Sequence, residues 1–218
     1  MITDIFENLT KNSCKWNNYF EIHEKHLNKF VSKSPKVLEI GIFEGGSLEM
    51  WAKYFGEGTK VVGVDIDPKF LEHKYDYDVE IVIGDQGNPE FWNNFHTTHE
   101  GFDFILDDGG HTMDQQITTL EKCWPLLNEG GIIMIEDIHT SYHAHYGSEG
   151  PTNFVRYVGD NLIHMPMHQH WHRSQTDERI CDIFRDLHSF TIYNGIVVFE
   201  KRKFVETFCL GVAPKAFR

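Results

Sequence analysis

The sequence of 218 residues predicts an α/β fold, in which helices cover both faces of a doubly wound, mainly parallel sheet. Five short apolar segments alternate with helical segments, as in a parallel sheet built from right-handed crossovers. Most of the apolar segments end in glycine or carboxylate residues. The pair Asn194-Gly195 lies between two further strand-like segments and indicates a closing hairpin with an antiparallel strand.

Local patterns then define the elements in order. Apolar residues at helical spacing predict a helix over 16–31. A helix over 47–55 has Ser47 as its candidate cap, and Pro68 begins another helix at a position where proline is tolerated. We expect Gly130-Gly131 to end a helix over 112–127. The expected strands are 36–41, 60–65, 79–83, 101–107 and 132–135, then 190–193 and 196–199 in the hairpin, with one further short helix over 91–95.

Composition limits the binding partners that we expect for this protein and the cellular compartment in which we expect it. The chain carries 20 Lys and Arg against 33 Asp and Glu, a net charge of −13, which disfavours a nucleic-acid partner. Its four cysteines (Cys14, Cys123, Cys181 and Cys209) form no CxxC, so we expect a reducing compartment and a packing role. The N-terminus lacks a signal-peptide pattern, and no apolar run approaches the ~20 residues of a membrane span. The sequence therefore predicts a soluble cytoplasmic protein without a membrane partner.

The ends of the first three predicted strands carry residues suited to a nucleoside. Ligands of doubly wound sheets bind outside the carboxyl ends of the strands. Gly41 opens a glycine-rich loop, although it departs from GxGxxG and lacks the GK[ST] of a P-loop, and a plain turn is an equal reading. Asp65 could accept hydrogen bonds from ribose hydroxyls or cap the following helix. Asp67 is the better candidate for the cap, which leaves Asp65 available for a ligand. Asp85 and Gln86 suit an adenine edge, or a simple turn.

The next two strand ends are acidic. Asp107-Asp108 and Glu136-Asp137 would meet if these strands are neighbours, because adjacent strands lie about 4.8 Å apart. Carboxylates alone favour a hard cation such as Mg²⁺. The alternative is that they are separate, solvated helix caps. His111 fits a general base beside a metal-held hydroxyl, a metal ligand, or an ordinary residue at a helix start.

A separate group of histidines follows the last acidic pair. His164, His168, His170 and His172 resemble a soft-metal cluster, but no cysteine or carboxylate stands nearby at ligand spacing. We interpret them as part of a surface or lid segment.

The ordered motifs LEIGIFEGGS, VVGVDIDP, GDQ, FDFILDDGGH and GGIIMIEDIHTSY resemble those of class I S-adenosylmethionine-dependent methyltransferases. The last two are the specific part. They resemble the metal-dependent sugar O-methyltransferases of macrolide biosynthesis, of the mycinamicin and macrocin type, and the related cephalosporin-hydroxylase-like group. The resemblance covers residues 36–142 and the closing HSFTIYNGIVVFEK. It implies a Rossmann-like, seven-stranded sheet of order 3-2-1-4-5-7-6 with an antiparallel last strand.

The resemblance also implies a site. His111 would be the catalytic base, and Ser141 and Tyr142 would shape the acceptor pocket. The expected magnesium ligands are Asp108, Glu136 and Asp137. The expected residues around S-adenosylmethionine are Glu39, Gly41, Ser47, Asp65, Asp85, Gln86 and Asp107. The chain departs from the family at Gly110, where serine is usual, and in having only a 35-residue N-terminal segment instead of a large extra domain.

We therefore expect an N-terminal helical segment (1–35) and a methyltransferase domain (36–218), within which the irregular stretch 138–182 serves as an acceptor-site lid. The expected activity is Mg²⁺-dependent O-methylation of a small-molecule hydroxyl, on a sugar or glycosylated natural product, with homo-oligomerisation left open. The alternatives are a nicotinamide-dependent oxidoreductase, a catalytically silent cofactor-binding module, a metal-free methyltransferase with a nitrogen or carbon acceptor, and a metal-dependent hydrolase.

Overall fold

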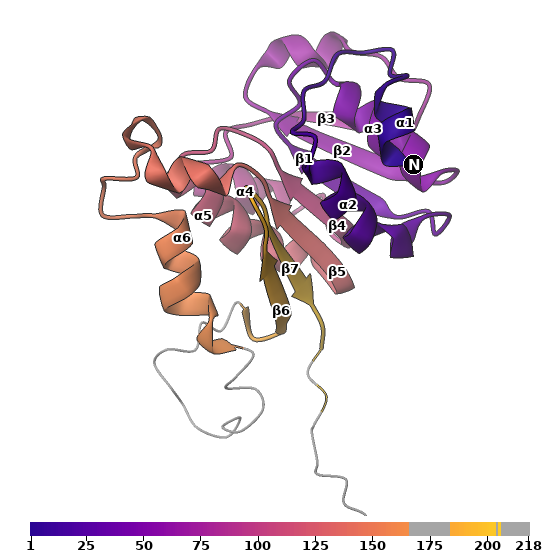
Figure 1. The fold of residues 1–218 in the computed structure, drawn as a ribbon. Coiled ribbons are helices and arrows are strands. Elements are labelled where there is room, and N and C mark those ends of the chain that lie inside the picture. The colour runs from indigo at the N-terminus through magenta and orange to yellow at the C-terminus, as the bar shows by residue number, and fades with distance from the viewer. Residues whose placement is uncertain (166–183, 204, 206–218) are drawn as a thin grey trace, which may run out of the picture.

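The computed structural model describes residues 1–165, 184–203 and 205. Its sheet has seven strands in the order β3-β2-β1-β4-β5-β7-β6, and β7 runs antiparallel to both of its neighbours. This order and the antiparallel strand confirm the predicted fold (Figure 1). The strands are β1 Lys36–Ile40, β2 Lys60–Asp65, β3 Val79–Ile83, β4 Phe102–Asp107, β5 Leu127–Ile135, β6 Leu187–Ile192 and β7 Val197–Lys201.

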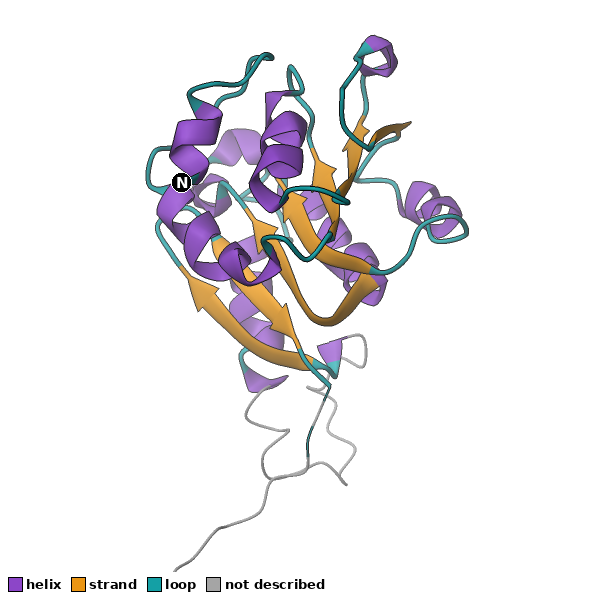
Figure 2. Ribbon diagram, turned by 90° about the vertical axis from the view of Figure 1, so that its right-hand side faces the viewer, coloured by secondary structure: helices purple, strands orange, loops and turns teal. Residues whose placement is uncertain are grey.

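Helices cover both faces of the sheet (Figure 2). The α-helices are α1 Ile2–Phe6, α2 Tyr19–Leu27, α3 Gly46–Phe55, α4 Pro89–Phe95, α5 Met113–Cys123 and α6 Phe154–Tyr157. The 3₁₀ turns are Asn28–Phe30, Pro68–Glu72, Trp124–Leu126, Ile138–Tyr142 and Ala144–Tyr146, and a π-helical turn spans Val158–Leu162. None of the helices in the described ranges combines the length and apolarity needed to cross a bilayer.

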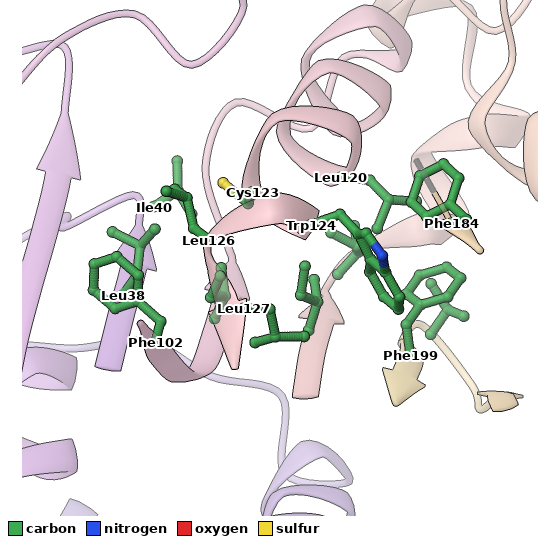
Figure 3. Packing of buried hydrophobic residues seen from close by; sticks show 14 of the residues in the cluster. Leu38, Ile40, Phe102, Leu120, Cys123, Trp124, Leu126, Leu127, Phe184 and Phe199 are labelled. Carbon is green, nitrogen blue, oxygen red and sulfur yellow. The ribbon is translucent and has the colours of Figure 1, made fainter. Parts of the chain in front are cut away.

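Alternation along the strands divides the core into two layers. Leu38 and Ile105 point toward α4, α5 and α6, whereas Val37 and Phe104 point toward α1, α2 and α3. In the first layer, Trp124 packs beside Phe184 with ring centroids 5.3 Å apart (Figure 3). The N-terminal helices belong to the second layer. The sheet is therefore buried on both faces, and its strand ends remain as the place for a ligand.

Several boundaries differ from the sequence-based prediction. The helix expected over 16–31 begins at Tyr19 and ends at Leu27, and Trp16 lies in the preceding loop. The Asn18 side chain donates a hydrogen bond to the Asn194 carbonyl. Helix α3 is capped by Gly45, whose φ of 84° makes the turn, so Ser47 lies inside the helix and caps nothing. By contrast, Asp67 does cap the turn that Pro68 begins.

The prediction was wrong at the junction between the helix over 112–127 and the strand that follows it, because the helix ends earlier and the strand begins earlier than expected. Helix α5 ends at Cys123, and a 3₁₀ turn that contains Pro125 follows it. Strand β5 begins at Leu127, where it pairs with Phe102 of β4. Gly130 and Gly131 therefore lie inside the strand and do not end the helix. Proline ends the helix, since it has no N–H to donate.

The structure tests part of the packing role expected for the cysteines. Cys123 is fully buried in the core, as predicted. Cys14 is exposed and lines a cavity, so the packing interpretation is wrong there. Cys181 and Cys209 lie outside the described residues, as do His168, His170 and His172 of the histidine group.

Candidate active site

A cavity of about 600 Å³ opens at the carboxyl ends of β1 to β5. Its walls combine the glycine-rich loop after β1 with the acidic ends of β4 and β5 and with the loop that precedes α2. The lining residues from the sequence prediction are Gly41, Asp65, Asp85, Gln86, Asp108, His111, Glu136 and Asp137. One space therefore collects the residues expected at the nucleoside and those expected at the metal.

The loop after β1 lies directly against the loop after β4. Gly41 has a φ of 91°, and a Cβ on it would lie 2.1 Å from the Asp108 carbonyl oxygen. The Gly41 N–H donates to the Val64 carbonyl, and the Asp108 N–H donates to that of Ile40. Only glycine meets both requirements, a left-handed backbone and this close approach.

Asp65 stands at the end of β2. Its Oδ2 accepts a 2.9 Å hydrogen bond from the Ile42 N–H, and its Oδ1 accepts one of 3.0 Å from the Asp67 N–H. Each carboxylate oxygen has two lone pairs, so capacity remains for two hydroxyl donors from a ligand. The two backbone bonds fix the carboxylate in one orientation at the cavity wall.

The residues after β3 differ in their availability. Asp85 is exposed, and its carboxylate accepts a bond from the Gly87 N–H. The Gln86 amide is engaged: its Nε2 donates to Asp107 and Thr119, and its Oε1 accepts from the Gly110 N–H. Gln86 thus ties the third strand end to the fourth, and Asp85 is the residue left free to meet an adenine edge.

Three residues that we expected at the cofactor do not line the cavity. Glu39 is fully buried and accepts a hydrogen bond from the Trp51 indole, and burial raises its pKa to about 7. Asp107 is fully buried beside Gln86, and burial raises its pKa to about 6. Ser47 is buried in α3 next to Glu39. In this structure they support the wall of the site from behind.

The acidic cluster contains a lysine that the sequence analysis missed. Lys15 Nζ lies 2.5 Å from Asp108 Oδ2, 2.9 Å from Glu136 Oε2 and 3.7 Å from Glu39 Oε1, and its side chain is only 1% exposed. Burial opposes the charge, but the three carboxylates raise the pKa of Lys15 well above its ordinary value. The ammonium therefore stays protonated.

Two further residues of α2 complete the surroundings of the carboxylates. His23 Nε2 lies 2.7 Å from Glu136 Oε1, and the Tyr19 hydroxyl donates to Asp137 Oδ1 at 2.6 Å. Burial alone would raise the pKa of Glu136, but Lys15 and His23 lower it to about 2. A sequence signal for His23 existed, because it stands on the apolar face of its helix between Phe20 and Leu27. No motif marked Lys15, although so many carboxylates implied a countercharge.

Of the three expected magnesium ligands, Asp108 and Asp137 are placed to bind a divalent cation. Asp108, His111 and Asp137 each offer one atom within 4.8 Å of the others. The Asp108 and Asp137 side chains are 22% and 19% exposed, so their oxygens are accessible from the cavity. Carboxylate oxygens suit Mg²⁺. Both oxygens of Glu136 are already occupied, by Lys15 and by His23.

His111 is held in a strained backbone conformation beside this pair. Its φ is 59° and that of Asp137 is 55°, and Phe43, which also lines the cavity, has a φ of 50°. Such conformations cost roughly 1–3 kcal/mol each and cluster at functional sites. His111 Nε2 lies 3.6 Å from Asp137 Oδ2, and burial lowers the pKa of the ring. The imidazole is therefore neutral at neutral pH and able to accept a proton.

Comparison with known proteins identifies related methyltransferases. Residues 38–138 match the family described as "Methyltransferase domain". The chain is 27% identical over 223 residues to demethylmacrocin O-methyltransferase of Streptomyces fradiae, an alignment that covers 93% of this chain and 54% of that protein. It is 34% identical over 171 residues to 8-demethyl-8-alpha-L-rhamnosyl tetracenomycin-C 2'-O-methyltransferase of Streptomyces olivaceus, covering 72% and 44%.

A solved structure shares the fold. The MycE methyltransferase of the mycinamycin biosynthetic pathway, in complex with Mg and SAH, superposes with a TM-score of 0.81 at 22% identity, covering 98% of this chain and 57% of that one. The chain spans about half the length of the curated relatives that it matches. Residues 38–138 thus match a methyltransferase domain, and the chain as a whole shares the fold of MycE and is similar in sequence to macrolide sugar O-methyltransferases.

Proposed function

We propose that this protein transfers the methyl group of S-adenosylmethionine to a hydroxyl group of a sugar or glycosylated natural product, with a divalent cation held in the acidic part of the site. The observation that carries the proposal is the single cavity, which holds Gly41 and Asp65 on one side and Asp108, His111 and Asp137 on the other. Donor and acceptor would therefore meet within one cavity.

The nucleoside part of the cofactor fits the first three strand ends. The Asp65 carboxylate accepts hydrogen bonds from the ribose hydroxyls, and the Asp85 carboxylate accepts one from the amino group at the adenine edge. The absence of a side chain at Gly41 lets the methionine part approach the backbone. The Ile66 side chain, which is 67% exposed and lines the cavity, offers apolar surface for the adenine face.

The acceptor side is served by His111 and the two aspartates. Asp108 and Asp137 would hold the cation, which when bound lowers the pKa of an acceptor hydroxyl and orients it. His111 Nε2 takes the proton of that hydroxyl, and Asp137 at 3.6 Å stabilises the imidazolium that results. The acceptor oxygen then bonds to the methyl carbon as the carbon–sulfur bond breaks, and the sulfonium becomes a neutral thioether.

A sugar acceptor agrees with the relatives and with the mouth of the cavity. Two of the relatives are named as O-methyltransferases of demethylmacrocin and of a rhamnosyl tetracenomycin. Trp16 is 59% exposed and lines the cavity, and its ring lies 6.4 Å from that of His139. An exposed indole offers an apolar face to the C–H groups of a sugar ring.

The test is a pair of calorimetric titrations, with S-adenosylhomocysteine and with Mg²⁺, on wild type and three variants. S-adenosylhomocysteine binds to wild type and binds at least tenfold more weakly to Asp65→Ala. Asp137→Asn keeps that affinity within about twofold but loses Mg²⁺ binding, whereas Asp114→Asn, at an exposed acid of α5, changes neither. Hydroxylated glycosides are then screened for S-adenosylhomocysteine release. A wild type that does not bind S-adenosylhomocysteine overturns the proposal.

A further inference from the structure

The lysine in the acidic cluster is carried by a loop that is fixed against the rest of the fold. Residues 7–18 connect α1 to α2. Within this loop, the Thr10 N–H and hydroxyl donate to the Glu49 carboxylate, and the Asn12 carbonyl accepts from the Gly46 N–H. Lys11 lies over the Tyr75 ring at 5.0 Å. These contacts bring Lys15 to the carboxylates as a built part of the site.

The ammonium group fills the inner part of the cluster. Lys15 Nζ is within 3 Å of one oxygen of Asp108 and one of Glu136. The other Glu136 oxygen lies 2.7 Å from His23. Each oxygen of Glu136 thus contacts a side chain of the N-terminal segment, and the Glu136 side chain is only 1% exposed.

A divalent cation and this ammonium cannot share the inner position. Mg²⁺ sits at about 2.0–2.1 Å from its ligand oxygens. A cation bonded to Asp108 Oδ2 and Glu136 Oε2 would contact Nζ directly, and like charges at such a distance repel strongly in a partly buried site. On the cavity side, Asp108 Oδ1 and Asp137 Oδ2 lie 4.0 and 3.6 Å from His111 Nε2 and are not bonded to the lysine.

We propose that Lys15 is a resident cation of the acidic site, which occupies the inner position between Asp108 and Glu136 and confines a divalent cation to the outer position between Asp108 and Asp137. Glu136 then serves as the counter-ion of Lys15 and His23 and is not a metal ligand. Lys15 also weakens metal binding, since it neutralises one of the two ligand carboxylates. Because the divalent cation belongs to the function proposed above, this assignment rests on that function.

The test measures Mn²⁺ affinity, by calorimetry and by the electron paramagnetic resonance signal of free Mn²⁺. Lys15→Met binds Mn²⁺ about tenfold more tightly or better, a gain of about 1.4 kcal/mol at 25 °C. Lys15→Arg, which keeps the charge, stays near wild type. Lys11→Met is the matched control, because it removes the same charge from the same loop but away from the carboxylates, and it changes the affinity by no more than about twofold.

Glu136→Gln, made both in wild type and in Lys15→Met, tells whether the metal occupies the inner or the outer position. In wild type this variant changes Mn²⁺ affinity less than about threefold, because Glu136 is not a ligand there. In Lys15→Met the same change removes most of the gain, because the inner position has become available to the metal. The comparison of Glu136→Gln with wild type remains informative even if Lys15→Met, which leaves buried carboxylates unpaired, does not fold.

Two results overturn the assignment: Lys15→Met binding Mn²⁺ no more tightly than wild type, or Glu136→Gln abolishing Mn²⁺ binding while Lys15 is present. Either leaves the proposed function standing if Asp137→Asn still loses the metal. If neither wild type nor Lys15→Met binds Mn²⁺, the assignment fails together with the metal part of the proposed function. S-adenosylhomocysteine binding to the same samples then shows whether the methyl-transfer part survives.

Discussion

The contact between the loops after β1 and β4 gives the sharpest test of how the site is built. Gly41 combines a φ of 91° with a Cβ position 2.1 Å from the Asp108 carbonyl oxygen and 2.8 Å from the Gly109 Cα. Replacing Gly41 by alanine therefore imposes two costs, one from the backbone conformation and one from the collision. The second cost falls on the segment that carries Asp108.

The two costs can be separated with a second glycine. Gly130 has a φ of 79° and nothing within 4 Å of its Cβ position, so Gly130→Ala measures the conformational cost alone. That cost is roughly 1–3 kcal/mol. The collision adds roughly 1–3 kcal/mol more, as overpacking usually does, because both partners at Gly41 are backbone atoms. For a chain of this size, 1 kcal/mol lowers the Tm by about 2–4 °C, so Gly41→Ala melts roughly 2–12 °C below Gly130→Ala.

The assay is thermal unfolding followed by circular dichroism, with Mn²⁺ and S-adenosylhomocysteine affinities measured on the same samples. Gly41→Ala also weakens the binding of both ligands. Asp108 and the loop after β1 must move apart to make room for the alanine side chain. Gly130→Ala leaves both affinities unchanged. Equal melting temperatures for the two variants would refute the reasoning, because the collision would then have no cost.

Three further predictions concern chemistry, pH and helix capping. His111→Ala lowers kcat by roughly 10²–10⁴-fold and leaves the affinity for S-adenosylhomocysteine intact. His145→Ala, at an exposed histidine, leaves kcat unchanged. Unchanged turnover in His111→Ala would exclude His111 as the base. Burial raises the pKa of Glu39 to about 7, so the folded state holds an extra proton between about pH 4.5 and 7 and loses stability as pH rises. The Tm advantage of Glu39→Gln over wild type therefore grows from pH 5 to pH 8, and a constant difference contradicts this. Thr112→Ala removes the capping box of α5 and costs roughly 0.5–2 kcal/mol in urea unfolding, which Thr112→Ser largely restores; equal losses in both would exclude the cap.

Local patterns in the sequence determined the strands and the cavity wall that they carry. Strand β2 was predicted with its observed bounds, because a continuous apolar run between turn residues has few alternatives. Asp65 and Asp108 were expected at a common edge because the carboxyl ends of parallel strands meet there. The order of the strands came from the resemblance to a family and not from periodicity.

The tertiary structure alone decided how the acidic residues are neutralised. Lys15 meets Asp108 and Glu136 across 93 and 121 positions of sequence, and His23 meets Glu136 across 113. Spacing along one strand or helix cannot predict such contacts, because they depend on where the N-terminal loop lies over the sheet. The same holds for Glu39 and Asp107, which stand at strand ends but are buried behind the cavity wall. The sequence thus determined which carboxylates gather at one edge, and only the packing of distant segments decided which of them face a ligand, since burial and charge pairing arise when those segments come together.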